Sequence, residues 1–202
     1  MNRTAILIAA LAGLLLAAQA QAQAPGQGLY IGLGVGTVWS KGGQIYNDTV
    51  NEDASPGGKA YIGYMSNDNW GMEFGLHALG EFEAKFGGAK IADMKTNALS
   101  ISGVYTQPLF ASGYNVNVRL GLAFTDARYT CASLCGSGTP ANVDTKKRGT
   151  SGTIGIGIGA KITQALSMRV DFDHFGSVKH QVDATEFNES YDVLSANLQL
   201  LF

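Results

Sequence analysis

The sequence predicts an all-β protein, an eight-stranded antiparallel up-and-down transmembrane β-barrel. Apolar residues alternate with small or polar residues in eight separate segments, with the period of two expected for a strand that has two different faces. Short and long connections between these segments also alternate. After residue 24 the chain has no uninterrupted apolar run of the length that a spanning helix needs, so only strands could cross a membrane.

The N-terminal segment has the features of a secretory signal peptide. A positively charged start is followed by a nearly uncharged apolar run over 5–18, and then by small residues in alternate positions. This run of about 14 residues is shorter than the roughly 20 that span a bilayer as a helix. We predict cleavage after Ala22, because Pro25 is a poor residue just after a cut. Residues 1–22 are then the signal peptide, and residues 23–202 form one barrel domain.

The predicted strands follow one another along the mature chain. Their ranges are 29–37, 59–65, 70–78, 98–105, 114–125, 154–162, 166–173 and 193–202. The fifth is the clearest, because every second residue from Tyr114 to Phe124 is apolar and the residues between them are small or polar. Strands of about ten residues match a tilted crossing of an apolar layer roughly 25–30 Å thick.

The lengths of the connections predict which end of the barrel faces the exterior. Short connections are expected near 67–69, 108–113 and 163–165, and long ones near 40–57, 81–94, 130–149 and 177–190. In barrels of the bacterial outer membrane the short turns face the periplasm and the long loops face outward. The pattern therefore indicates that membrane, with a possible host or surface ligand recognised by the long loops.

The apolar face of each strand is predicted to point outward, to lipid. An eight-stranded barrel has an interior just wide enough for side chains, and the many Ile, Leu, Phe and Met residues of this face would crowd it. Aromatic residues near the predicted strand ends suit the two membrane interfaces: Tyr30, Tyr64, Trp70, Tyr105, Tyr114 and Phe202. The alternative is a soluble lipocalin-like barrel with its apolar face inward.

The opposite face of the strands carries charged residues that are expected to lie inside the barrel. Strand parity gives three acids and three bases: Glu73, Arg119, Lys161, Arg169, Asp171 and Asp173. An unpaired charge in so narrow an interior costs several kcal/mol, so these side chains are expected to pair. The sequence therefore predicts an ionic network in the lumen, without a continuous water path.

Composition and cysteine spacing limit the other possibilities. The formal net charge of −2 argues against nucleic acid as a partner. Cys131 and Cys135 lie close together in a stretch rich in Gly, Ser and Thr, and a secreted chain reaches an oxidising compartment. We predict a disulfide between them that closes a small loop, and neither a metal site nor a cofactor.

The chain resembles the transmembrane domain of the outer-membrane protein A family and its small-barrel relatives. The stretches that carry the resemblance are Leu29-Tyr30-Ile31-Gly32, Ile62-Gly63-Tyr64, Trp70-Gly71-Met72-Glu73-Phe74-Gly75, Arg119-Leu120-Gly121, Gly157 to Phe172 and Leu194 to Phe202. The resemblance implies that Phe202, the terminal aromatic, is an assembly signal read by the barrel-assembly machinery. Outer-membrane lipid and lipopolysaccharide are the other partners that it implies.

The resemblance also implies roles for lumenal residues. In that family a glutamate on the third strand pairs with bases inside the barrel, and Glu73 and Arg169 match these positions. The family's lumenal lysine and second lumenal acid correspond here to Val104 and Gly159, which puts the family's switchable gate in doubt. A fixed ionic plug is the favoured interpretation.

The functional prediction is a structural or surface-interaction role, without enzymatic activity. A narrow pore is the first alternative. The second is a lipid A-modifying enzyme with His174 activating Ser177, but residues three apart on a strand point to opposite faces. The basic run over 146–148 could contact anionic lipopolysaccharide, although such runs are more often simply solvated.

Overall fold

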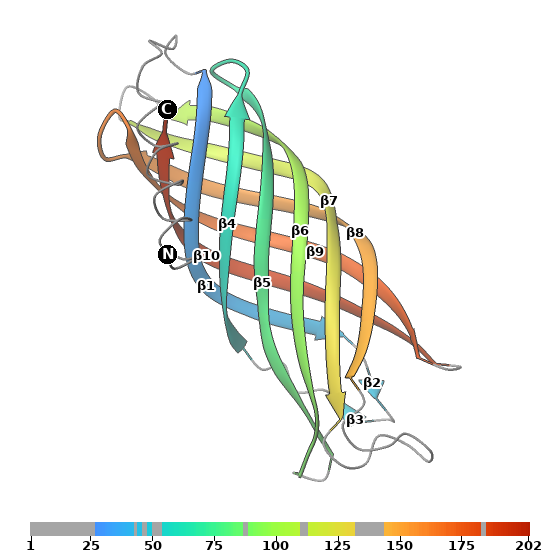
Figure 1. Ribbon diagram of the computed structural model, residues 1–202. Coiled ribbons are helices and arrows are strands. Elements are labelled where there is room, and N and C mark those ends of the chain that lie inside the picture. Colours follow the sequence, from blue (N-terminus) through green and yellow to red (C-terminus); the bar gives the residue numbers. More distant parts are fainter. Residues whose placement is uncertain are drawn as a thin grey trace, which may run out of the picture.

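A computed structural model describes residues 27–42, 44–45, 48–49, 54–86, 89–109, 113–131, 144–182 and 185–202. Eight long strands form a closed antiparallel barrel in which each pairs with the next long strand, and β10 pairs back with β1 (Figure 1). They are β1 (Gly28–Gly42), β4 (Ala54–Met65), β5 (Trp70–Phe86), β6 (Ala89–Leu109), β7 (Tyr114–Cys131), β8 (Asp144–Lys161), β9 (Leu166–Val182) and β10 (Thr185–Leu201). β2 (Gln44–Ile45) and β3 (Asp48–Thr49) form a separate two-stranded sheet. The predicted fold class is confirmed.

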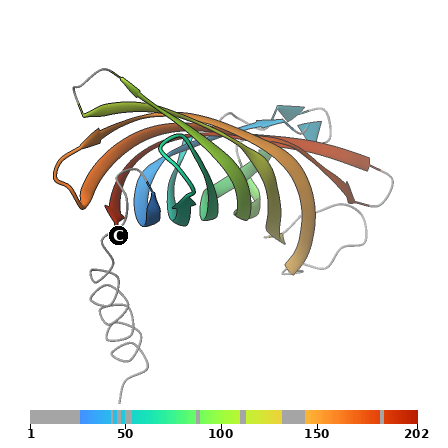
Figure 2. The same cartoon turned by 90° about the horizontal axis from the view of Figure 1, so that it is seen from above.

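The short turns lie at one end of the barrel, and the pairing of β10 with β1 that closes the barrel continues to that end. The turns over 66–69 and 162–165 lie at this end, and Leu201 N–H donates to the carbonyl oxygen of Ala165 at 2.8 Å. Phe202 N–H donates to the carbonyl oxygen of Leu29 at 2.8 Å, which extends the pairing of β10 with β1 to the last residue. Figure 2 shows how strongly the strands curve. No described residues form a helix long and apolar enough to cross a membrane. That Phe202 signals assembly stays a prediction.

Two predicted long connections are wrong, because strands occupy most of them. The ranges 81–94 and 177–190 belong largely to β5–β6 and to β9–β10. The register of β5 against β6 shifts between Ala78 and Glu81, where Gly80 has a φ of 91°, and β9–β10 has a similar irregularity. A bulge inverts the phase of the alternation, so a search for strict period two stops there.

The outer face of the barrel is an apolar belt, as the alternation predicts. Exposed large apolar side chains come from every long strand and include Leu33, Val35, Ile62, Phe74, Leu76, Leu99, Leu120, Leu122, Phe124, Ile154, Ile156, Ile158, Val170, Phe172, Leu194 and Leu198. Side chains between them in sequence point into the barrel, where many are buried. This arrangement suits a barrel surrounded by lipid and excludes the lipocalin-like alternative, in which the apolar face is inside.

One of the six predicted interfacial aromatic residues is placed differently. The rings of Trp70 and Tyr105 contact each other on the outer surface at a tilt of 58°, with centroids 4.8 Å apart, and Tyr64 and Tyr114 are exposed. Tyr30, by contrast, is only 3% exposed and lies in the lumen. Its place near a strand end does not decide its face, because strand parity sets it opposite to its outward-facing neighbours.

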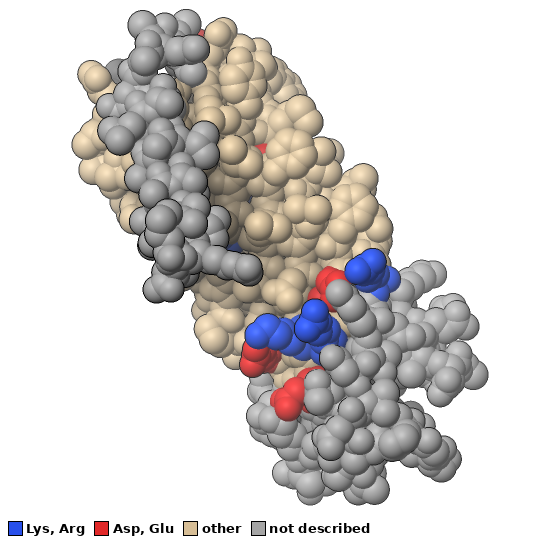
Figure 3. Space-filling view, in the orientation of Figure 1, with Lys and Arg blue, Asp and Glu red and all other residues tan. Residues whose placement is uncertain are grey.

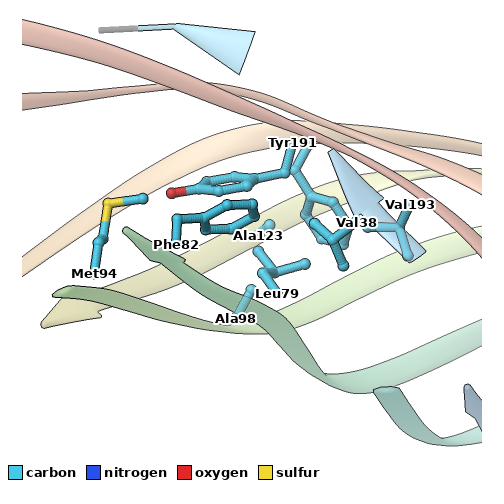
Figure 4. Close-up of a cluster of buried hydrophobic side chains, with 9 residues drawn as sticks. Val38, Leu79, Phe82, Met94, Ala98, Ala123, Tyr191 and Val193 are labelled. Atoms are coloured by element: carbon cyan, nitrogen blue, oxygen red, sulfur yellow. The ribbon is translucent and has the colours of Figure 1, made fainter. Parts of the chain in front are cut away.

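The lumen contains an apolar cluster toward the end opposite the short turns (Figure 4). It consists of Val38, Leu79, Phe82, Met94, Ala98, Ala123, Phe175, Tyr191 and Val193. Phe82 enters it because the bulge at Gly80 turns the following even-numbered residues of β5 inward. The rings of Phe82 and Tyr191 lie 6.2 Å apart. We call this group the apolar cluster.

Some predictions fall outside the described residues. They are the signal peptide over 1–22, its cleavage after Ala22, and Cys135. The structure describes the backbone of Cys131 at the end of β7 but not its side chain. The disulfide and the cleavage site therefore stay predictions.

Candidate functional site: a buried ionic cluster in the lumen

Six charged side chains from four strands meet inside the barrel. They are Lys59 on β4, Glu73 on β5, Arg119 on β7, and Arg169, Asp171 and Asp173 on β9. None of the six residues is more than 6% exposed. Three acids and three bases make the group formally neutral, which suits an interior where an unpaired charge would be costly. We call this group the ionic cluster.

Asp171 is the centre of the cluster. Its Oδ2 accepts hydrogen bonds from Lys59 Nζ at 2.7 Å, Arg169 Nε at 2.9 Å and Asn197 Nδ2 at 3.0 Å. Its Oδ1 accepts one from Arg119 Nη1 at 3.0 Å. With all three bases on one carboxylate, the loss of any one base would affect the whole cluster.

Asp173 forms a second junction, one pleat further along β9. Arg119 donates to Asp173 Oδ1 through Nη2 at 2.7 Å and through Nε at 3.2 Å, and Lys59 Nζ donates to Oδ2 at 3.0 Å. Arg119 also donates to the side-chain oxygen of Asn117. Asp171 and Asp173 therefore share Arg119 and Lys59 and are linked into one network.

Glu73 anchors the other side of the network. Arg169 donates through Nη1 and Nη2 to Glu73 Oε2, at 3.1 Å each, and Tyr30 O–H donates to the same oxygen at 3.2 Å. The guanidinium carbon of Arg169 lies 4.5 Å from the centre of the Tyr61 ring, a cation–π geometry. Arg169 thereby bridges Glu73 and Asp171 across the lumen.

Glycines on β8 provide the space for these carboxylates. A Cβ atom at Gly157 would lie 2.1 Å from Asp171 Oδ1, and one at Gly155 would lie 2.2 Å from Asp173 Oδ1. Register places Gly157 opposite Asp171 and Gly155 opposite Asp173. The period-two glycines of β8 are therefore a packing feature of the lumen.

The structure brings five of the six predicted lumenal residues together and leaves one out. Lys161 is exposed at the end of β8, beside a short turn, and pairs with no acid among the described residues. Lys59 supplies the third base instead. Sequence reasoning missed it, although parity along 59–65 puts Lys59 on the same face as Tyr61, away from the outward-facing Ile62.

A histidine connects the ionic cluster with the apolar cluster. His77 lies opposite Lys59 in the register of β4 with β5, and its Nε2 shares a hydrogen bond of 2.9 Å with Ser100 Oγ. The ring of His77 meets that of Phe175 edge-on at 5.0 Å. Phe175 belongs to the apolar cluster, so His77 lies between the ionic cluster and the apolar cluster in the lumen. Val104, at the position of the family's lumenal lysine, is buried and apolar.

A cavity of about 510 Å³ opens at the short-turn end of the barrel. Its lining includes Tyr30, Asn117, Lys161, Arg169 and Phe202, but not the acids of the ionic cluster. The cavity therefore ends at the level of Arg169.

His174 has a partner that the sequence did not reveal. Its Nδ1 lies 2.6 Å from Asp192 Oδ1, and Asp192 Oδ2 lies 2.7 Å from Lys41 Nζ. These residues lie on the outer face, just beyond Phe172 and the apolar belt. Among the described residues, no group of three or more His, Cys, Asp or Glu is arranged to hold a metal ion.

Comparisons with known proteins agree with the barrel. Residues 8–198 match the family model described as outer membrane protein beta-barrel domain. No curated protein matches. The fold is similar to that of Neisserial surface protein A (13% identity, 86% of this chain and 97% of that chain, TM-score 0.59) and of OprG from Pseudomonas aeruginosa (11% identity, 87% and 96%, TM-score 0.60). It is also similar to that of a major outer membrane protein from Thermus thermophilus (10% identity, 85% and 99%, TM-score 0.53). With its closed barrel and apolar belt, this chain belongs to the family of outer membrane protein β-barrel domains and resides in the bacterial outer membrane.

Proposed function

We propose that this protein is a non-conducting outer-membrane barrel with a structural or surface-interaction role. The observation that carries the proposal is the ionic cluster, whose hydrogen bonds join β4, β5, β7 and β9 across the lumen. A lumen filled by paired side chains leaves no continuous column of water. The apolar cluster adds a second obstruction on the outer side of the first.

The strands that project beyond the apolar belt support the surface role. β5, β6, β7 and β8 carry exposed charged residues past the belt, where lipid ends and solvent begins. Strands of this length present their tips well outside the membrane. In many proteins the binding residues lie on connecting segments that a rigid scaffold positions, and here the barrel would be that scaffold.

Solute flux tests the proposal against the alternative of a narrow pore. The cavity at the short-turn end favours that alternative, because it opens the lumen at one end. Proteoliposomes with the purified barrel should swell no faster in a small sugar than empty liposomes, whereas a general porin in the same lipid should swell quickly. Fast swelling with this protein would reject the closed barrel.

Lipid analysis tests the absence of enzymatic activity. The pair of His174 with Asp192 favours the alternative of a lipid A-modifying enzyme, because an oriented histidine is part of a hydrolytic site. Mass spectrometry of lipid A should find the same species in cells with and without the protein. A new deacylated or substituted species, lost on His174→Ala, would identify an enzyme.

A further inference from the structure

The cavity at the short-turn end of the barrel has the size of a small-molecule site. Its volume of about 510 Å³ falls within the range of roughly 300–1,000 Å³ that is usual for ligand pockets. It opens beside the short turns and ends at Arg169, where the ionic cluster crosses the lumen. Short turns of outer-membrane barrels face the periplasm, so a solute would enter the cavity from that compartment.

Two lumenal positions with little side-chain volume help to create this cavity. Gly159 has no side chain, Val104 has a short one, and both line the cavity. They are the two positions at which the sequence departs from the lumenal charges of the family that it resembles. A Cβ atom at Gly159 would lie 2.7 Å from Asn115 Oδ1, so the glycine also makes room for that amide. The space therefore follows from residues particular to this chain.

One wall of the cavity is polar and comes from three neighbouring strands. The register sets Asn115 on β7 opposite Gly159 on β8, and Gly159 opposite Arg169 on β9. One pleat closer to the short turns, Lys161 lies opposite Ser167. Within the described part of the chain, the side chains of Asn115, Lys161 and Ser167 make no hydrogen bond or ion pair. Their polar groups are therefore available to a bound molecule.

The charges that face the cavity favour an anion. Arg169 lines the cavity, whereas Glu73 and Asp171, the acids that it binds, do not. The formally neutral ionic cluster thus presents a basic side to the cavity, and Lys161 adds a second positive charge. Asp68, in an exposed turn where solvent screens its charge, is the one acid among the described lining residues.

The rest of the wall includes apolar side chains. Val104 on β6, Met65 on β4 and Leu201 on β10 line the cavity. A ligand that suits both parts of the wall has an anionic head and an apolar body. We propose that the cavity binds a small organic carboxylate from the periplasm, with the carboxylate at Lys161 and Ser167. The hydrogen bond from an ammonium group to a carboxylate is charge-assisted and therefore stronger than a neutral one.

This inference goes beyond the proposed function, and the two can fail separately. A barrel that is closed in bilayer recordings but binds no carboxylate would keep the proposed function and lose the site. A barrel that conducts and still binds the carboxylate would keep the site and lose the closed lumen.

Fluorine NMR of the folded barrel in lipid nanodiscs tests the inference. The probe is 4-fluorobenzoate, and 4-fluorobenzamide is a neutral molecule of nearly the same shape. The wild type should broaden the signal of the benzoate in a saturable manner, whereas the amide signal should match that with empty nanodiscs. Lys161→Gln should weaken binding of the benzoate by about fivefold, the size of one partly exposed charge pair.

Arg148→Gln is the matched control for the lost charge. It removes a base toward the other end of β8, opposite the short turns, where charged side chains of the outer surface gather (Figure 3). This variant should bind the benzoate as the wild type does. A second variant tests the cavity itself, because Val104→Phe adds a ring to the apolar wall and should also weaken binding. Heat modifiability on a gel identifies the folded variants, and Lys161→Gln decides alone where Val104→Phe does not fold.

Several results would overturn the inference. The absence of saturable broadening with the wild type would exclude a ligand of this class, and equal binding of the amide would exclude recognition of the charge. Unchanged binding in either folded variant would place the site elsewhere. Displacement of the benzoate by an equimolar amount of inorganic phosphate would show that the apolar body contributes nothing. Weaker binding in Lys161→Gln and Val104→Phe but not in Arg148→Gln is the expected outcome.

Discussion

The ionic cluster and the apolar cluster occupy the same lumen but fill it by different physical means. In the ionic cluster, three carboxylates and three bases hold one another in fixed directions, with Asp171 accepting from all three bases. In the apolar cluster, side chains such as Phe82 and Leu79 contact one another without directional bonds. The first is sensitive to the loss of a single partner, and the second is sensitive mainly to lost volume.

The positions of the two clusters match this difference. The ionic cluster lies at the level of the apolar belt, where Arg169 and Asp171 alternate with the outward-facing Val170 and Phe172. Lipid around the barrel keeps water away there, so each charge depends on its partners. The apolar cluster lies further out, where Phe175 and Tyr191 follow the end of the belt on β9 and β10. We propose that the ionic cluster fixes the geometry of the lumen and that the apolar cluster fills its outer part.

Removal of one base should have the largest effect on stability. Arg169→Ala leaves Glu73 and Asp171 buried without their shared partner, and such changes typically cost about 3–5 kcal/mol. Urea unfolding in lipid vesicles measures the loss. Lys161→Ala, at an exposed position without an acidic partner in the described part of the chain, should stay within about 0.5 kcal/mol of the wild type. Equal stabilities of the two variants would mean that the ionic cluster contributes nothing.

Added volume beside Asp171 should have the next largest effect. In Gly157→Ala the new Cβ would lie 2.1 Å from Asp171 Oδ1, and several donors hold that carboxylate in place. Overpacking of this kind costs about 1–3 kcal/mol. Gly152→Ala on the same strand is the control, because a Cβ there meets no atom within 4 Å. If both substitutions were neutral in vesicle unfolding, the carboxylate would be free to move.

Shortening a side chain in the apolar cluster should lower the free energy of unfolding less than Arg169→Ala does. Val38 is fully buried in that cluster, and Val38→Ala removes two methyl groups without leaving a charge behind. About 1–2 kcal/mol is expected from lost burial and the small cavity. The same urea experiment gives the comparison. A cost above that of Arg169→Ala would reverse the ranking of the two clusters.

The smallest effect on the barrel is expected from the cysteines. A Cys131–Cys135 disulfide would close a short loop between β7 and β8, beyond both clusters. Peptide mapping without reduction should find the two residues linked. The double variant Cys131→Ser, Cys135→Ser should nevertheless keep the heat modifiability of the folded barrel. Its loss would show that the connection supports the barrel wall.

Much of the fold and part of the site could be predicted from the sequence, because strand parity is a local property. Parity alone sets Glu73 and Arg169 on the inner face. The placement of Tyr30 was wrong because nearness to a strand end was given more weight than parity, which sets Tyr30 on the inner face. The two bulges were not predictable from alternation, since they are the points where alternation changes phase, and the bulge in β5 hid Phe82.

The ion-pair partner of a side chain is harder to predict than the face of the strand on which it lies, because the partner depends on the register between distant strands. Lys59 and Asp171 are far apart in sequence and meet only when the barrel closes. The same holds for His174 and Asp192, whose contact follows from the pairing of β9 with β10. Charge balance adds to strand parity as a clue to Lys59, because the acids lack a base once Lys161 is assigned to the rim.

Single-channel recording in planar bilayers tests the central claim most directly. The account predicts that the folded wild-type barrel shows no steady conductance, because the ionic cluster and the apolar cluster both obstruct the lumen. The recordings should use protein whose heat modifiability on a gel shows a folded barrel, so that an absence of conductance does not reflect failed folding or insertion. Large, steady channels from such protein would contradict the claim and make this barrel a pore.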